Sequence, residues 1–160
     1  MSLVLRPIAR SDADALHALF TETGVRQYLF DDVVLTREET QRHVEAALTH
    51  DAWAVELHGP IVGFTSLRPV GDGRELMIAI SERCWGRGVA FEAARAAMRH
   101  GFEVLKLERI LAGVDLPNER SHRLMMRLGF TPTGETDGPK YRARTYEVSA
   151  AAWSTSSRRC

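Results

Sequence analysis

Cysteine is scarce in this chain of 160 residues, and the chain carries no net charge. The two cysteines, Cys84 and Cys160, cannot form a Cys-x-x-Cys pair, a zinc cluster or a disulfide framework, so we expect a reducing, cytoplasmic location. Lys and Arg together number 21, and so do Asp and Glu. This balance removes the broad positive charge expected of a protein that binds nucleic acid or an anionic membrane, and neither is expected as a partner.

Long hydrophobic runs are also missing. Residues 1–10 hold arginines on both sides of Pro7 but no apolar run of signal-peptide length, so neither secretion nor a membrane span is expected. The six histidines include no pair four residues apart with an acid nearby, and no metal site is expected. A hydrophobic content of 44% suffices for one core. We therefore expect one domain over residues 1–153 and an irregular polar tail over residues 154–160.

The spacing of apolar residues predicts an α/β domain with a mixed sheet. Strands are expected at 3–8, 52–57, 61–67, 75–80, 108–114, from 130 onward and at 141–148, and helices after an N-cap at Ser11–Asp12 and at 36–50, 88–101 and 118–128. Small residues recur on one face of the helix from Gly88, which lets it lie close against the sheet. Residues 24–35 fit either a substrate-facing loop or short helix, or a connector with buried aromatic side chains.

The most informative motif is Arg83-x-x-Gly86-x-Gly88, which directly follows a predicted strand and opens a predicted helix. The first N–H groups of a helix have no partners within it and lie at the positive end of its dipole, and glycines let a phosphate approach the backbone. The motif therefore predicts an anion site. A P-loop is disfavoured because Gly-Lys-Ser/Thr is absent, and a dinucleotide fingerprint is disfavoured because position 91 is Phe rather than Gly or Ala.

This motif resembles the R/Q-x-x-G-x-G/A signature of the GNAT superfamily of acyl-CoA-dependent N-acyltransferases. The run from Glu75 through Trp85-Gly86-Arg87-Gly88 is similar to the Rim-type branch, which acetylates protein N-termini. A second block is similar to the same branch, namely Val114-x-x-x-Asn118-x-x-Ser121-x-x-Leu124 followed by Leu128-Gly129-Phe130. Both blocks have the order and separation seen in that family.

The resemblance implies a single-domain GNAT fold: a mixed, mostly antiparallel sheet with a V-shaped split between strands 4 and 5, and helices on both faces. Acetyl-CoA would be the co-substrate in that split, where its pantetheine arm would pair with the main chain of Ile78 and Ile80. Asn118 would also contact CoA, and the backbone of the glycine motif and of the following helix start would hold the pyrophosphate. The positions in this last group are Arg83, Cys84, Gly86, Arg87, Gly88, Val89 and Ala90.

The resemblance also implies direct attack of a neutral amine on the thioester, with no covalent enzyme intermediate. Glu75 is the candidate base; the alternative interpretation is a solvated strand end, and Glu108 is the alternative base. The family's usual acid, a tyrosine, is replaced by Met125. Ser121 is the candidate hydrogen-bond donor to the leaving thiolate, although Asn118 and Ser121 also fit an ordinary helix start.

The acceptor stays open at this stage. A protein N-terminus and a small-molecule primary amine fit the sequence equally well, and so do a monomer and a homodimer. Because the usual tyrosine is missing, a non-catalytic module that senses or binds acyl-CoA is the alternative function.

Overall fold

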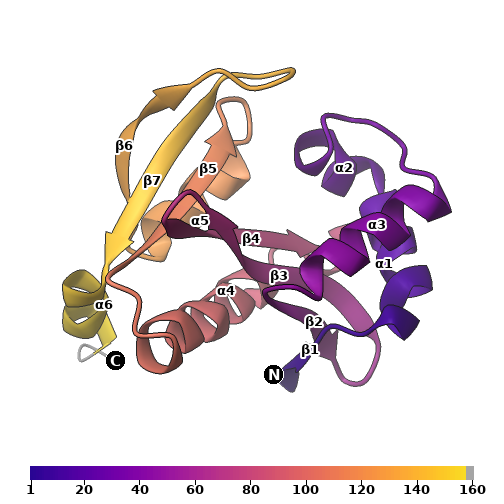
Figure 1. Cartoon of the computed structure of the whole chain (residues 1–160), viewed down its shortest axis with the longest axis horizontal. Helices are drawn as coiled ribbons and strands as arrows, with labels where there is room; N and C mark the ends of the chain where they lie inside the picture. Colours follow the sequence, from indigo (N-terminus) through magenta and orange to yellow (C-terminus); the bar gives the residue numbers. More distant parts are fainter. Residues whose placement is uncertain (158–160) are drawn as a thin grey trace.

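The computed structural model describes residues 1–157, which form a seven-stranded sheet in the order β1-β2-β3-β4-β5-β7-β6 (Figure 1). Within that sheet, β4 and β5 are parallel and the other neighbouring pairs are antiparallel, as predicted. The strands are β1 (Leu3–Pro7), β2 (Asp51–Leu57), β3 (Ile61–Val70), β4 (Gly73–Ile80), β5 (Arg109–Asp115), β6 (Thr131–Thr136) and β7 (Ala143–Ser149).

Helices cover both faces of the sheet, which confirms the predicted layering. One face packs against α1 (Ala13–Phe20), α2 (Thr23–Leu29) and α3 (Arg37–Ala47), and Val44 and Ala79 share its core. The other packs against α4 (Val89–Arg99), α5 (Glu119–Arg127) and α6 (Ala150–Ser157), and Met98 and Met125 share its core. We call these the α2 face and the α4 face. Short helical turns are η1 (Arg10–Asp12), η2 (Glu82–Cys84) and η3 (His100–Val104).

Small residues hold α4 close to the sheet, as their spacing predicts. Ala93, Ala94 and Ala97 are fully buried. At Gly101, just after α4, a Cβ atom would lie 3.0 Å from side-chain atoms of both Leu67 and Ile110. Larger side chains at these positions would push α4 away from the sheet, and they would move the loop that precedes α4 with it.

The predicted N-cap at Ser11–Asp12 is confirmed in position, because α1 begins directly after Asp12, but the Asp12 side chain does not cap the helix. Ser11 lies within η1, and the Asp12 carboxylate caps no N–H of α1. That carboxylate instead accepts the backbone N–H of Ala9 at 2.8 Å and two hydrogen bonds from the guanidinium of Arg6 at 2.9 and 3.1 Å. A guanidinium is the stronger partner for a carboxylate, and this one comes from β1, six residues before Asp12.

The structure decides between the alternatives for one segment and corrects the expectation for another. Within residues 24–35, most of the first half is helical in α2, which agrees with the short-helix alternative. Of the expected irregular tail, residues 154–157 are helical because α6 continues through them, and residues 158–160 lie outside the described residues. Trp153 anchors α6, since its ring packs 5.5 Å from that of Phe102.

Candidate active site

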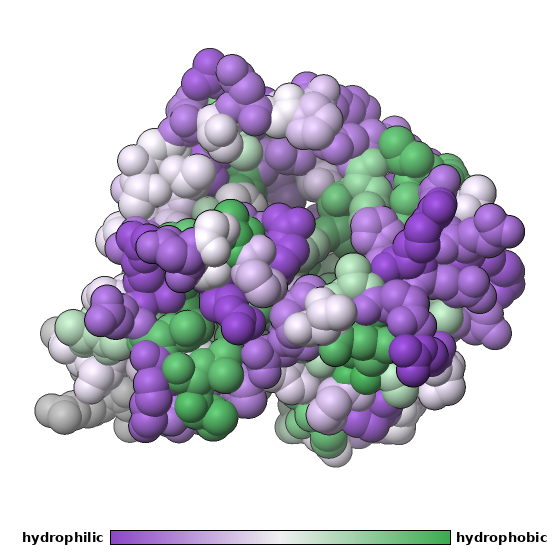
Figure 2. All heavy atoms as spheres, in the orientation of Figure 1, coloured by the Kyte–Doolittle hydropathy of each residue, from purple (hydrophilic) through white to green (hydrophobic). Residues whose placement is uncertain are grey.

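Strands β4 and β5 separate after a single point of contact. Their register has one pair, Glu75 with Leu111, beyond which residues 76–80 and 112–115 form the two sides of a split. Figure 2 shows the surface hollowed between the β6–β7 hairpin and α2, where the split opens. The V-shaped split predicted between strands 4 and 5 is therefore confirmed.

The loop between β4 and α4 has the geometry of an anion site. Gly86 and Gly88 have φ angles of 72° and 78°, a left-handed conformation that favours glycine, and Gly88 is the N-cap of α4. A Cβ atom at either glycine would meet nothing within 4 Å, so the backbone there faces open space. Beside the first N–H groups of α4, this space fits the pyrophosphate of CoA.

The other loop positions differ in what they offer a ligand. Arg83 and Arg87 are exposed and can add positive charge. The side chains of Cys84, 4% exposed, and Val89 are buried in the core, so these two residues can meet a ligand only through their backbone. Ala90 is partly buried at the edge of the same core.

The edge of β4 that faces β5 has no strand partner beyond Glu75 among residues 1–157, which suits a pantetheine arm paired like an added strand. Ile78 and Ile80 lie on this stretch and pair with β3 on the other side. The carbonyl of Ile80 already accepts the indole N–H of Trp85 at 2.8 Å. Ile78 is therefore the freer of the two predicted main-chain contacts.

The first turn of α5 lies beside the loop. The guanidinium of Arg120 lies 3.4 Å from the ring centroid of Trp85, which joins this turn to the residue before Gly86. Asn118 caps α5 by accepting the N–H of Ser121 at 3.4 Å, and its amide donates to the Ser121 hydroxyl oxygen at 3.1 Å. Asn118 and Ser121 are thus a helix cap in the turn that stands next to the loop between β4 and α4.

Met125 occupies the position of the family's tyrosine, and it lies in the core. Its side chain is 3% exposed and packs with Phe130 and Tyr146. The phenol oxygen of Tyr146, a 2% exposed residue, lies 2.6 Å from Nδ1 of His122. Since Nε2 of His122 faces the carbonyls of Asp115 and Leu116 at 3.1 and 3.2 Å, it carries the proton, and Tyr146 donates to Nδ1. This pair fixes α5 against the end of β5.

Glu75 lies on the α2 face at the apex of the split. Its neighbour Leu76 packs into the α4-face core, so strand alternation directs Glu75 the other way. Oε1 of Glu75 forms an ion pair with Nη2 of Arg68 at 2.6 Å. Oε2 points across the split, since it lies 3.9 Å from where a Cβ atom of Gly113 would be. The other candidate base, Glu108, lies outside β5, and its carbonyl accepts the N–H of Ala150.

Two carboxylates and two aromatic rings lie where α2 and the residues after it approach the end of β5 and the β6–β7 connection. The rings of Tyr28 and Tyr141 lie 5.5 Å apart and bring α2 to the β6–β7 connection. Burial raises the pKa of the Asp115 carboxyl above its usual range, and the negative charge of Asp31 raises it further. Asp31 itself has a φ of 52°, a strained conformation for a residue other than glycine. We call these four residues the acceptor wall.

The sequence offered a substrate-facing segment as one alternative for residues 24–35, which include Tyr28 and Asp31, but it singled out neither residue. Asp115 and Tyr141 were not predicted as site residues. The available signal was the alternation of β5, in which Asp115 falls on the face opposite Ala112 and Val114. The closeness of Asp115 to Asp31 depends on the path of the chain between α2 and α3, and no local sequence pattern predicts that path.

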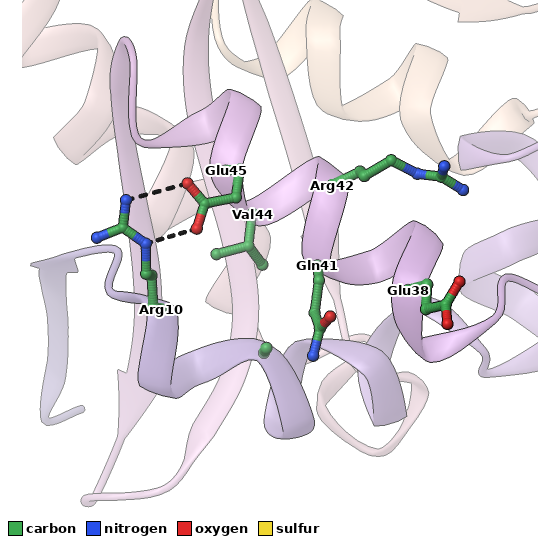
Figure 3. A pocket seen from close by; sticks show the side chains of 7 residues that line it. Arg10, Glu38, Gln41, Arg42, Val44 and Glu45 are labelled. Atoms are coloured by element: carbon green, nitrogen blue, oxygen red, sulfur yellow. Dashed lines mark hydrogen bonds and ion pairs between the residues drawn. The ribbon is translucent and has the colours of Figure 1, made fainter.

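A separate groove of about 480 Å³ lies between η1, α1 and α3 (Figure 3). Arg10, Gln41 and Glu45 are among the residues that line it, and Arg10 forms an ion pair with Glu45 at 2.5 Å. None of its lining residues belongs to β4, β5, α4 or α5. It is therefore not part of the split described above.

Comparisons with known proteins agree with this geometry. The family model of the acetyltransferase (GNAT) domain matches residues 2–131. The chain belongs to the GNAT acetyltransferase family. Spermidine N(1)-acetyltransferase of Escherichia coli K12 is 30% identical over 141 residues, which are 84% of this chain and 75% of that protein.

Solved structures share the GNAT fold. A GNAT-family acetyltransferase from Bacillus anthracis has a TM-score of 0.84 at 24% identity, covering 94% of this chain and 96% of its own. Spermidine N-acetyltransferase from Vibrio cholerae, in complex with CoA and spermine, has a TM-score of 0.80 at 19% identity, covering 94% of this chain and 97% of its own.

Family membership confirms the predicted activity, transfer of an acetyl group from acetyl-CoA as co-substrate to an amine. Within residues 1–157, no cluster of three or more His, Cys, Asp or Glu side chains has the arrangement that a metal ion requires. No helix in the same range is long and apolar enough to cross a membrane.

Proposed function

We propose that this GNAT enzyme acetylates a small cationic primary amine in a ternary complex with acetyl-CoA. Acetyl-CoA binds on the α4 face, with its pyrophosphate on the backbone of residues 83–90, its pantetheine arm along Ile78 and Ile80, and Asn118 beside the arm. The amine binds on the α2 face. The observation that carries the choice of acceptor is the acceptor wall, because the carboxylates of Asp31 and Asp115 and the rings of Tyr28 and Tyr141 all attract a cation.

Glu75 suits the base because it shares the α2 face with the acceptor wall. Arg68 occupies one of its oxygens, and the other points across the split, where it can take the amine proton directly or through water. The amine lone pair attacks the acetyl carbonyl carbon, the C–S bond breaks, and the bonding pair leaves on sulfur. A hydrogen bond from Ser121 stabilises the thiolate until it takes a proton, a role for which no phenol is present at position 125.

Two finer assignments belong to this proposal. The Asn118–Ser121 pair supports the resemblance to the Rim-type branch, whose acceptors are protein N-termini, whereas the acceptor wall favours a compact polycation. The E. coli relative acts on spermidine, as its name states. We further propose the cytoplasm as the location, on the small number of cysteines, and a monomer or homodimer as the assembly.

A panel of acceptors tests the proposal. Release of free thiol from acetyl-CoA is measured with three acceptors. Two are polycations, spermidine and the aminoglycoside ribostamycin, and the third is a peptide that has a free N-terminus and a neutral sequence. We expect one of the two polycations to give the highest kcat/KM. A preference for the neutral peptide would overturn the small-amine assignment, and CoA binding without turnover on any amine would indicate an acyl-CoA-sensing module.

A further inference from the structure

Two glutamates join the start of α2 to the turn after β4, and each caps the helix of the other. Glu22 is the N-cap residue of α2, yet its carboxylate bonds to no group of its own helix. It accepts the hydroxyl of Ser81 at 2.7 Å and the backbone N–H of Glu82 at 2.8 Å, at the start of η2. In return, the Glu82 carboxylate accepts the backbone N–H of Gly24, in the first turn of α2.

This exchange differs from an ordinary helix cap, in which the N-cap side chain binds the N–H groups of its own first turn. An ordinary cap stabilises one helix, whereas the exchanged caps make the first turns of α2 and η2 depend on each other. Ser81 is 4% exposed, so its hydroxyl cannot turn to bulk solvent for a replacement partner. The contact is a specific junction between two segments that lie about 60 residues apart in the chain.

The junction has space for glycine alone at position 24. A Cβ atom there would overlap the Glu82 carboxylate and the ring of Trp85. Trp85 is also the residue on which Arg120 of α5 stacks. The start of α2, the loop between β4 and α4, and the first turn of α5 therefore meet around one indole ring.

The junction connects the two substrate sites of the proposed function. The C-terminal part of α2 and the residues after it carry Tyr28 and Asp31 of the acceptor wall, and the turn that holds Glu82 leads directly into the glycine loop. α2 is only seven residues long, so a displacement of its first turn displaces the whole helix.

We propose that Glu22 is a positioning residue that holds the acceptor wall in a fixed position relative to the loop between β4 and α4. Bound CoA would then order α2 before the amine binds. This inference rests on the proposed function for the location of the two substrates. Its thermodynamic consequence is a coupling, because a ligand that orders one side of the junction lowers the cost of ordering the other side. Glu22 touches neither substrate, and it acts through the placement of α2 relative to the turn after β4.

The variant pair Glu22→Ala and Glu22→Gln tests the role. Alanine removes both hydrogen bonds, whereas glutamine retains the geometry, since its carbonyl accepts from Glu82 N–H and its amide donates to the Ser81 oxygen. Glu38→Ala, at an exposed acidic residue of α3, is the matched control. Hydrogen exchange of amides in residues 23–29 is measured with and without CoA, and kcat/KM is measured with spermidine at saturating acetyl-CoA.

In the wild type and in Glu22→Gln, CoA should slow exchange in α2. In Glu22→Ala this protection should vanish although CoA still binds, and kcat/KM for spermidine should fall roughly 10- to 100-fold, the scale of a misplaced reactant. Gly24→Ala should have the same effect through overlap, and it decides the question if Glu22→Ala fails to fold. Two results would overturn the proposal. One is CoA protection of α2 that is equal in the wild type and in whichever of Glu22→Ala and Gly24→Ala folds. The other is a wild type in which CoA does not slow exchange in α2.

The exchange measurement does not depend on the acceptor. If spermidine is not acetylated but CoA protects α2 only while Glu22 is intact, the junction stands and the acceptor assignment fails. If spermidine is acetylated equally well by the wild type and by Glu22→Ala, the acceptor assignment stands and the positioning role fails.

Discussion

Nη2 of Arg68 lies 2.6 Å from Oε1 of Glu75, and the two residues face each other in the β3–β4 register. The ion pair occupies Oε1 of Glu75, the proposed base, whereas Oε2 points toward the split. It also shows why strand position alone left two roles open for Glu75, since a solvated ion pair and a base at the apex of the split use the same residue.

Glu75→Gln retains the size of the side chain and removes its basicity. We expect kcat to fall roughly 10²- to 10⁴-fold with little change in acetyl-CoA affinity, as measured by steady-state kinetics and calorimetry. Glu108→Gln is the control and should retain kcat. A fall of less than about threefold in Glu75→Gln would move the role to Glu108 or to water.

Gly88→Val tests the phosphate loop. The valine side chain would fill the space above the backbone, and the affinity for CoA should drop roughly 100-fold, since hydrogen bonds to a charged phosphate contribute about 1.5–3 kcal/mol each. Gly71→Val is a matched control, because Gly71 also has a positive φ, 58°, and open space around it, but lies in the β3–β4 turn. Both variants carry similar backbone strain, so equal CoA affinities in the two would contradict the loop assignment.

Ser121→Ala tests the hydrogen bond to the leaving thiolate. The expected fall in kcat is roughly 10- to 100-fold, which corresponds to about 1.4–2.7 kcal/mol, with acetyl-CoA binding nearly intact. A rate equal to that of the wild type would reduce Ser121 to its contacts with Asn118 at the start of α5.

Met125→Tyr should not restore the tyrosine of other GNAT enzymes. Because Met125 is buried beside Phe130 and Tyr146, the larger ring would overpack the core and lower the free energy of unfolding by about 1–3 kcal/mol. Chemical denaturation of the single variant measures this cost. A Ser121→Ala, Met125→Tyr double variant that regains activity at full stability would show that the phenol reaches the split.

Asp115→Asn separates stability from acceptor binding. Because the pKa of Asp115 is raised in the folded state, its contribution to stability is fully present at low pH and is lost as pH rises through the folded-state pKa. The variant should therefore melt above the wild type at pH 7, and this gain should vanish below about pH 3, where the carboxyl is protonated in both states. At pH 7, KM for spermidine should rise roughly tenfold, equal to about 1.4 kcal/mol of lost attraction. An unchanged KM would remove Asp115 from the acceptor wall.

The features that could be predicted from the sequence are those that local spacing determines. Alanines along α4 and the glycines at 86 and 88 specify a helix close to the sheet and a loop open to phosphate, and both are present. The features that could not be predicted depend on partners that belong to a different helix or strand. Asp12 was expected to cap a helix but binds Arg6, and Glu22 was not singled out because its partners belong to the turn after β4.

Two-substrate steady-state kinetics with spermidine and acetyl-CoA, in which free thiol and acetylated amine are both quantified, test the central claim most directly. Direct transfer across the split predicts intersecting double-reciprocal lines and one thiol released per amine acetylated. Parallel lines, or thiol release that does not require the amine, would contradict a ternary complex with the two substrates on opposite faces of the sheet.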